Sequence, residues 1–127
     1  MYMQEFDLDR LLGGMLGEMT KGMYPATDIR SFDDRYVIEM DVPGFSKEDV
    51  NIEVRDHRLR ISSEKKFPRE GKYIAKGRIL KSFSHIYSIP DGVDEEKITA
   101  GMKDGVLTVT APKTQKEEPK AVSVKIG

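Results

Sequence analysis

The sequence predicts an all-β fold, a β-sandwich that carries an arm at its N-terminus and a tail at its C-terminus. From Pro25 to Pro112, apolar and polar residues alternate with a period of two, which is typical of strands buried on one face. Turn residues divide this stretch into short runs, among them Pro43-Gly44, Asp56-His57 and Asp104-Gly105. No long helical pattern interrupts it. Several short strands at such spacing are typical of a β-sandwich.

Length and composition limit the possible functions. The chain has 127 residues, which is room for one domain with a core of fewer than about 90 residues. It carries 21 Lys and Arg against 22 Asp and Glu, and the net charge of -1 argues against nucleic acid and anionic lipid as partners. The absence of cysteine excludes disulfides and thiolate metal ligands. Because the start of the chain lacks a secretory pattern and no apolar run has membrane-spanning length, we expect a cytoplasmic protein.

Residues 1–24 are predicted to form a flexible, partly helical arm. Their apolar side chains recur at helical spacing and would share one face of a helix: Leu8, Leu11, Leu12, Met15, Leu16, Met19 and Met23. Four glycines interrupt the pattern, and each costs a helix roughly 0.8 to 1 kcal/mol relative to alanine. Methionine side chains adapt to apolar partners of different shapes. We therefore expect the arm to bind apolar segments of other proteins, to be buried between subunits, or to do both in turn.

The predicted strands lie in the domain at residues 25–112. Alternation predicts a strand at 36–42 and a hairpin with strands at 50–54 and 59–61. Between the first strand and this hairpin, Ser46 followed by Asp49 predicts one short capped helical turn. Residues 64–78 are mostly polar and charged, so they are predicted to form a long excursion rather than a core strand.

The alternation resumes at residues 83–89 and continues in a last hairpin. Its strands lie at 98–102 and 107–111, on either side of Asp104-Gly105, a two-residue turn whose twist suits antiparallel strands. Pro112 ends this pairing because proline has no N–H to donate. Residues 113–127 form a C-terminal extension, which begins with a charged, solvated tether at 113–120.

The residue pattern argues against catalysis and against a metal site. No serine lies on a strand-to-helix nucleophile elbow. The two histidines have no cysteine partners and no HExxH spacing, so a zinc site is not expected. The acidic run Asp94-Glu95-Glu96 lacks an EF-hand pattern and is interpreted as a solvated turn. We expect neither an enzyme nor a bound cofactor.

The segment at residues 100–112 resembles the signature of the small heat shock proteins, the α-crystallin or Hsp20 family, of the bacterial or archaeal type. It contains an Ala, three residues, Asp104, then Gly-Val-Leu, alternating apolar positions and Pro112. The order of elements from Pro25 onward and the two flanks extend the resemblance to nearly the whole chain. It implies an immunoglobulin-like β-sandwich, the α-crystallin domain. It also implies an ATP-independent stress-response chaperone, a holdase that binds unfolded or partly unfolded client proteins as a dynamic homo-oligomer built from dimers.

The resemblance assigns a hook to the tail and a groove to the sandwich. In the family, an apolar-x-apolar hook docks at the sandwich edge of a neighbouring dimer. Val122-Ser123-Val124 fits this pattern, and Val124-Lys125-Ile126 fits equally well, so both hooks stay open. The implied groove lies between two strands that carry Val50, Ile52 and Val54 on one side and Ile98, Ala100 and Met102 on the other.

The resemblance also implies a dimer interface. In relatives, the excursion matching residues 64–78 carries a strand that is exchanged into the partner subunit. His85 stands where relatives usually have an arginine, which exchanges a permanent charge for a group that titrates near neutrality. Assembly is therefore hypothesised to change between about pH 6 and 7. The implied interface residues are Thr27, Asp28, Ile29, Tyr73, Ile74 and His85.

Two alternatives have different sequence requirements. A co-chaperone or adaptor of the related p23/CS sandwich class would bind one folded partner and would need neither hook nor exchanged loop. A membrane-surface role for the arm is disfavoured because its polar face is poor in Lys and Arg, with Arg10 and Lys21 alone.

Overall fold

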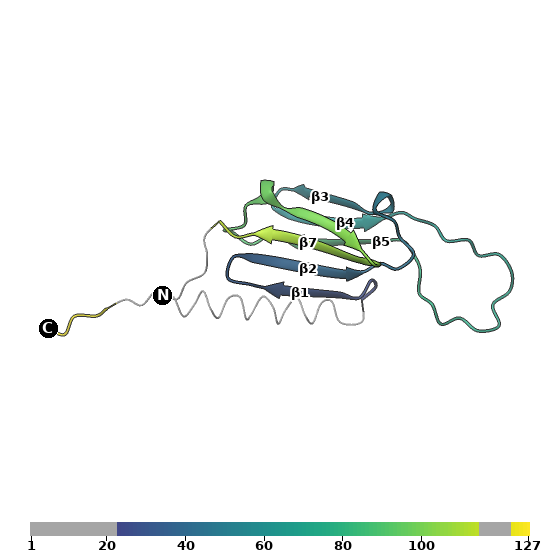
Figure 1. Cartoon of the computed structure of the whole chain (residues 1–127), viewed down its shortest axis with the longest axis horizontal. Helices are drawn as coiled ribbons and strands as arrows, with labels where there is room; N and C mark the ends of the chain where they lie inside the picture. Colours follow the sequence, from purple (N-terminus) through teal and green to yellow (C-terminus); the bar gives the residue numbers. More distant parts are fainter. Residues whose placement is uncertain (1–22, 115–122) are drawn as a thin grey trace.

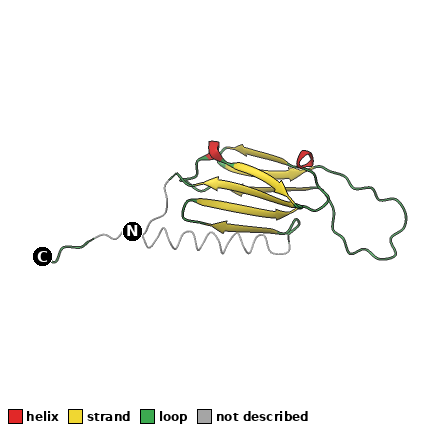
Figure 2. Cartoon of the chain, in the orientation of Figure 1, coloured by secondary structure: helices red, strands yellow, loops and turns green. Residues whose placement is uncertain are grey.

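The computed structural model describes residues 23–114 and 123–127 and shows a β-sandwich of two antiparallel sheets (Figures 1 and 2). The larger sheet has the order β1-β2-β7-β6 and the smaller one β3-β4-β5. The prediction of an all-β sandwich is confirmed. The strands of the larger sheet are β1 (Thr27–Ser31), β2 (Arg35–Asp41), β6 (Thr99–Lys103) and β7 (Val106–Pro112), and those of the smaller sheet are β3 (Asn51–Arg55), β4 (Arg58–Ser63) and β5 (Phe83–Ser88).

Two hairpins have the turns that the sequence predicts. Asp56 and His57 join β3 to β4 with φ angles of 52° and 61°. Asp104 and Gly105 join β6 to β7 with φ angles of 52° and 77°. Positive φ at both central residues is the geometry of the type I′ turn, whose twist matches that of the paired strands. These turns set the registers Arg55 to Arg58 and Lys103 to Val106.

Two short 3-10 helices lie outside the sheets. The first, η1 (Lys47–Asp49), follows Ser46, as the cap pattern predicts. The backbone N–H and the hydroxyl of Ser46 both donate to Oδ2 of Asp49, at 2.8 and 3.0 Å. The second, η2 (Glu95–Lys97), lies in the acidic segment that the sequence predicted only as a solvated turn.

The core lies between the two sheets. Met40 and Val109 of the larger sheet and Ile61 of the smaller one are at most 1% exposed. Their packing follows the predicted alternation, with side chains of one face of each strand directed inward. Val37 departs from this pattern, because it is buried although it lies on the other face of β2. The other buried apolar residues packed in the core cluster are Ile38, Val42, Phe45, Leu59, Phe83 and Leu107.

The connection from β4 to β5 projects from one end of the sandwich (Figure 1). It contains no strand, which confirms the predicted excursion. Within residues 23–114 and 123–127, no helix is long and apolar enough to span a membrane. The same part of the chain contains no cluster of His, Asp and Glu suited to hold a metal ion.

Candidate assembly and client-binding surfaces

Both strands of the predicted groove are edge strands. β3 ends the order of the smaller sheet, and β6 ends that of the larger sheet. In Figure 1, β3 and the green β6 lie toward the same side of the sandwich. Within the described part of the chain, each strand therefore has no strand partner along one side, as an added strand requires.

The apolar residues on these two edges fall into two groups. Val50, Ile52, Ile98 and Met102 are half-buried and pack against the core. Val54 and Ala100 are exposed. Four of the six predicted groove residues thus lie in the edge strands β3 and β6, and Val50 and Ile98 directly precede these strands. Part of the apolar surface of all six residues meets water.

The tail residues of the predicted hook are exposed where the structure describes them. Val124 is 85% exposed and Ile126 is 99% exposed. Val122 lies outside the described residues, so the choice between the two overlapping hooks is not decided. Of the predicted arm residues, Met23 is described and is exposed. The others, Leu8, Leu11, Leu12, Met15, Leu16 and Met19, lie outside the described part.

The predicted dimer interface is distributed over separate parts of the molecule. β1, which carries Thr27, Asp28 and Ile29, is the other edge strand of the larger sheet. Among the described residues its outer side pairs with no strand. In the loop between β4 and β5, Tyr73 is 55% exposed and Ile74 fully exposed. Among residues 23–114 and 123–127, this loop therefore does not pair with the β1 edge of the same chain.

His85 contacts Tyr24, where the arm joins the sandwich; this point is called the root of the arm. Its Nε2 is 2.7 Å from the backbone carbonyl oxygen of Tyr24, and because a carbonyl only accepts, the proton lies on Nε2. The imidazole stacks on Phe83, and Tyr24 meets Phe83 edge-on. Lys81 lies over the Tyr24 ring, 5.6 Å from its centroid. The sequence placed His85 at an interface but gave no sign of this contact, whose partners are 61 residues apart.

Lys65, which the sequence analysis did not identify, attaches the start of the β4–β5 loop to the sandwich. Lys65 Nζ donates to the carbonyl of Gly44 at 2.7 Å and to Oδ2 of Asp49 at 3.0 Å. It also lies over the rings of Phe45 and Phe67, which meet edge-on. Two hydrogen bonds lower the pKa of the Asp49 carboxyl. The larger effect comes from the Ser46 backbone N–H, and the next comes from Lys65.

A second pair joins the turn before β4 to η2. His57 Nδ1 lies 2.8 Å from Oε1 of Glu95. The hydrogen bond and charge of Glu95 raise the pKa of His57 above its usual 6.5. The backbone carbonyl of His57 also accepts from the N–H of Ile89. No sequence pattern links His57 to Glu95, because they are 38 residues apart.

The fold and these free edges define the class of protein: an immunoglobulin-like sandwich of the α-crystallin type. The model of the Hsp20/alpha crystallin family matches residues 28–127. The chain belongs to this family of small heat shock proteins, as the segment at residues 100–112 predicted.

Curated relatives occur in bacteria and in plants. Small heat shock protein C4 of Rickettsia felis is 37% identical over 110 residues, which cover 84% of this chain and 66% of that protein. The 17.5 kDa class I heat shock protein of Glycine max is 33% identical, with 79% of this chain and 68% of that protein covered. The spore protein SP21 of Stigmatella aurantiaca is 31% identical, and the chain spans 61% of its length. The chain thus spans about two thirds of the length of these relatives.

Solved structures agree with the observed sandwich. A small heat-shock protein from Xylella fastidiosa, described as revealing a distinct high order structure, has a TM-score of 0.67 and 26% identity. The match covers 82% of this chain and 98% of that one. Heat shock protein 16.0 from Schizosaccharomyces pombe has a TM-score of 0.65 and 31% identity, and covers 81% and 99% of the two chains.

Proposed function

We propose that this protein is a cytoplasmic, ATP-independent holdase that binds unfolded or partly unfolded proteins and prevents their aggregation. Family membership supports the proposal, and one structural observation carries it. Large apolar side chains, including Ile74, Ile79, Val124 and Ile126, are exposed outside a well-packed sandwich. An exposed apolar surface on a stable domain is suited to partners that expose apolar surface themselves. Binding the unfolded state needs no nucleotide and no catalytic group.

We propose further that the holdase is a homo-oligomer built from dimers. In the dimer, residues around Tyr73 and Ile74 add to the free β1 edge of the partner. Strand addition satisfies the unpaired backbone groups of an edge and buries alternate side chains. The description of the Xylella fastidiosa relative as a high order structure supports an assembly of this kind.

The tail connects these dimers. Two of its apolar side chains enter the groove between β3 and β6 of a neighbouring dimer, and each contributes about 1.5 to 3 kcal/mol before ordering costs. One contact is weak, but several contacts in one assembly act together while each still opens. The arm binds clients, is buried between subunits, or does both in turn. An adaptor of the p23/CS class would leave the exposed hook unused, and the family match, which extends to residue 127, gives that alternative no support.

Truncation tests these assignments. Aggregation of a heat-unfolded test protein is followed by light scattering without ATP, and the mass of each assembly is measured in parallel. Removal of residues 113–127 should reduce the assembly to dimers. Removal of residues 1–22 should weaken suppression while Tyr24 keeps its contact with β5. Unchanged mass without the tail would contradict the hook, and unchanged suppression without the arm would contradict its role.

A further inference from the structure

A hydrogen-bonded pair of side chains lies at one end of the proposed groove. His57, in the turn between β3 and β4, approaches Glu95 of η2, with 2.8 Å between Nδ1 and Oε1. Val54 of β3 lies just before this turn, and Ile98, which precedes β6, is the C-cap of η2. In Figure 1, the green coil of η2 lies beside the end of β3. The pair therefore connects the two sides of the groove.

The two sides of the groove belong to different sheets. β3 is an edge of the smaller sheet and β6 is an edge of the larger one, so no ladder of backbone hydrogen bonds joins them within residues 23–114 and 123–127. Apolar packing against the core is not directional, whereas a hydrogen bond holds its partners at a set distance and angle. The His57–Glu95 pair therefore restrains the separation of the two edges at this end.

The segment that carries Glu95 also holds the start of the tail. The backbone N–H and the hydroxyl of Thr114 both donate to the carbonyl oxygen of Gly92, at 2.6 and 3.1 Å. The N–H of Asp94 donates to the carbonyl oxygen of Pro112 at 2.9 Å. Residues 92–95 thus fix the point at which the tail leaves the sandwich. One short segment is linked both to the tail that the chain donates and to the groove that it offers.

We propose that the His57–Glu95 pair positions the groove for the tail of a neighbouring subunit, which rests on the proposed docking of the tail and adds a regulating group to it. A site that is already held in its bound shape loses less freedom when its partner binds. With the pair formed, the β3 and β6 edges are in place before the tail arrives. Without it, docking must also order η2 and this end of the groove. The pair therefore tightens docking.

Carboxylates from three segments make the pair sensitive to pH. The hydrogen bond to Glu95, and then its charge, raise the pKa of His57 above 6.5. The charges of Asp91, before η2, and of Asp56, in the same turn, add smaller effects in the same direction. All three carboxylates favour the charged imidazolium.

Cations also lie near His57. Arg55 and Arg58 form the last pair of the β3–β4 ladder and flank the turn, where they disfavour a further positive charge. On η2, the cation of Lys97 already pairs with Asp94 at 3.6 Å. Because the pKa of His57 is nevertheless raised, the carboxylates outweigh the cations.

Acid should therefore tighten the assembly and alkali should loosen it. The pair is complete below pH 6.5 and loses its charge attraction as pH rises through the raised pKa of His57. The neutral ring can still donate from Nδ1, so docking weakens rather than stops. One exposed charge pair changes an equilibrium about two- to fivefold. An assembly repeats the effect at every docked tail.

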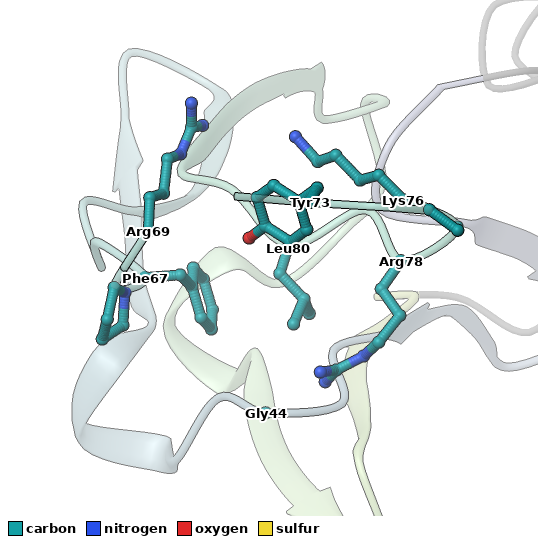
Figure 3. Close-up of a pocket in the computed structure, with 10 residues that line it drawn as sticks. Gly44, Phe67, Arg69, Tyr73, Lys76, Arg78 and Leu80 are labelled. Atoms are coloured by element: carbon teal, nitrogen blue, oxygen red, sulfur yellow. The ribbon is translucent and has the colours of Figure 1, made fainter. Parts of the chain in front are cut away.

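The pair lies at the opposite end of the sandwich from the β4–β5 loop. His57 precedes β4, and the loop follows β4 (Figure 1). Phe67 and Leu80, near the two ends of the loop, lie beside Gly44 (Figure 3). A change at His57 or Glu95 should therefore alter the docking of the tail and leave the exchange that forms the dimer unaffected.

Dilution of the full-length protein tests the proposal. Mass photometry gives the concentration at which half of the dimers are still in larger assemblies, at about pH 6 and at about pH 8.5. This concentration should be at least about twofold higher at the higher pH. The difference should shrink as salt is raised, because salt screens an exposed pair. Equal concentrations at the two pH values would overturn the proposal.

Three variants locate the effect. E95Q removes the charge that holds His57, and H57N removes the titrating ring but keeps a residue type that tolerates the positive φ of 61° found here. E96Q removes an equal charge from η2 outside the pair. The pH dependence should disappear in E95Q and H57N and remain in E96Q. If E95Q keeps the full pH dependence, another group such as His85 causes it and the proposal is refuted.

A further variant separates this proposal from tail docking itself. V124D should form only dimers at both pH values. Larger assemblies of V124D would contradict tail docking and the positioning role together. Dimers of V124D combined with pH-independent assembly of the unchanged protein would leave tail docking standing and refute the role of the pair. Melting temperatures above the assay temperature at both pH values show that each variant is folded, so that a changed concentration reports docking.

Discussion

His85 donates from Nε2 to the backbone carbonyl oxygen of Tyr24 at 2.7 Å and so ties the root of the arm to β5. The imidazole also stacks on Phe83, a buried core residue. The point at which the arm leaves the sandwich is therefore fixed by the core. Both the neutral Nε2–H tautomer and the imidazolium donate this bond, so protonation alone does not break it.

Replacement of His85 should loosen the root of the arm. His85→Ala leaves the Tyr24 carbonyl without its partner and should lower the free energy of unfolding by about 1 kcal/mol. Chemical denaturation measures this change, and limited proteolysis should show faster cleavage near residue 24. Ser88→Ala, an exposed change on the same strand, is the control. Equal stability of the two variants would show that the contact is not formed in solution.

The Asp49 contacts should stabilise the fold above the usual carboxylate pKa. Folding lowers the pKa of Asp49 from 3.8, so its stabilising effect is present above that value and is lost as pH falls through the lowered one. Asp49→Asn should therefore lower the melting temperature at neutral pH, and the difference should shrink as both proteins are acidified below pH 3.8. Glu48→Gln, in the same turn, should change little. A pH-independent difference would contradict the charged contact with Lys65.

The contact between His57 and Glu95 has the opposite pH dependence. Folding raises the pKa of His57 above 6.5, so the stabilisation is complete below that value and is lost as pH rises through the raised one. Glu95→Gln should destabilise the protein in mildly acidic solution and have little effect in alkaline solution. NMR titration of the two histidines should show the pKa of His57 returning toward its usual value in Glu95→Gln. A titration midpoint that does not move would contradict the pair.

Single substitutions in the tail should identify the hook. Val124 belongs to both candidate hooks, so Val124→Asp should reduce the assembly to dimers in either case. Val122→Asp should do so only if Val122-Ser123-Val124 docks, and Ile126→Asp only if Val124-Lys125-Ile126 docks. Val54→Asp, at an exposed site on β3, should have the same effect without unfolding the sandwich. Assemblies of unchanged mass in Val124→Asp would contradict docking by this tail.

The exchanged loop should be required for the dimer. Ile74 is fully exposed in the single chain, so Ile74→Asp should not destabilise the sandwich but should prevent burial against a partner's β1 edge. Analytical ultracentrifugation should then show monomers. Ile86→Asp, at an exposed site on β5, should leave the dimer intact. Dimers of unchanged stability in Ile74→Asp would contradict the exchange.

Local sequence patterns predicted most of the fold, but they did not predict contacts between residues that are distant in the sequence. The turns at Asp56-His57 and Asp104-Gly105 and the cap at Ser46 depend on neighbouring residues, so their signals lie in short stretches. The contact of Lys65 with Asp49 joins residues 16 positions apart, and that of His85 with Tyr24 joins residues 61 apart. No periodicity encodes such pairs, because they follow from the packing of the two sheets.

The β6 edge of the proposed groove was predictable only in part. Alternation at residues 98–102 placed the β6 residues on one face, and the sheet order then made β6 an edge.

We propose that this chain binds proteins as they unfold, without a nucleotide. The most direct measurement is to heat a mixture of this protein and a thermally unstable test protein without ATP, and then to separate the soluble fraction by size. We expect the test protein to elute in a large soluble complex with this chain, and we expect added ATP to leave the yield unchanged. A test protein that precipitates to the same extent as when heated alone, at every ratio of the two proteins, would contradict the holdase function.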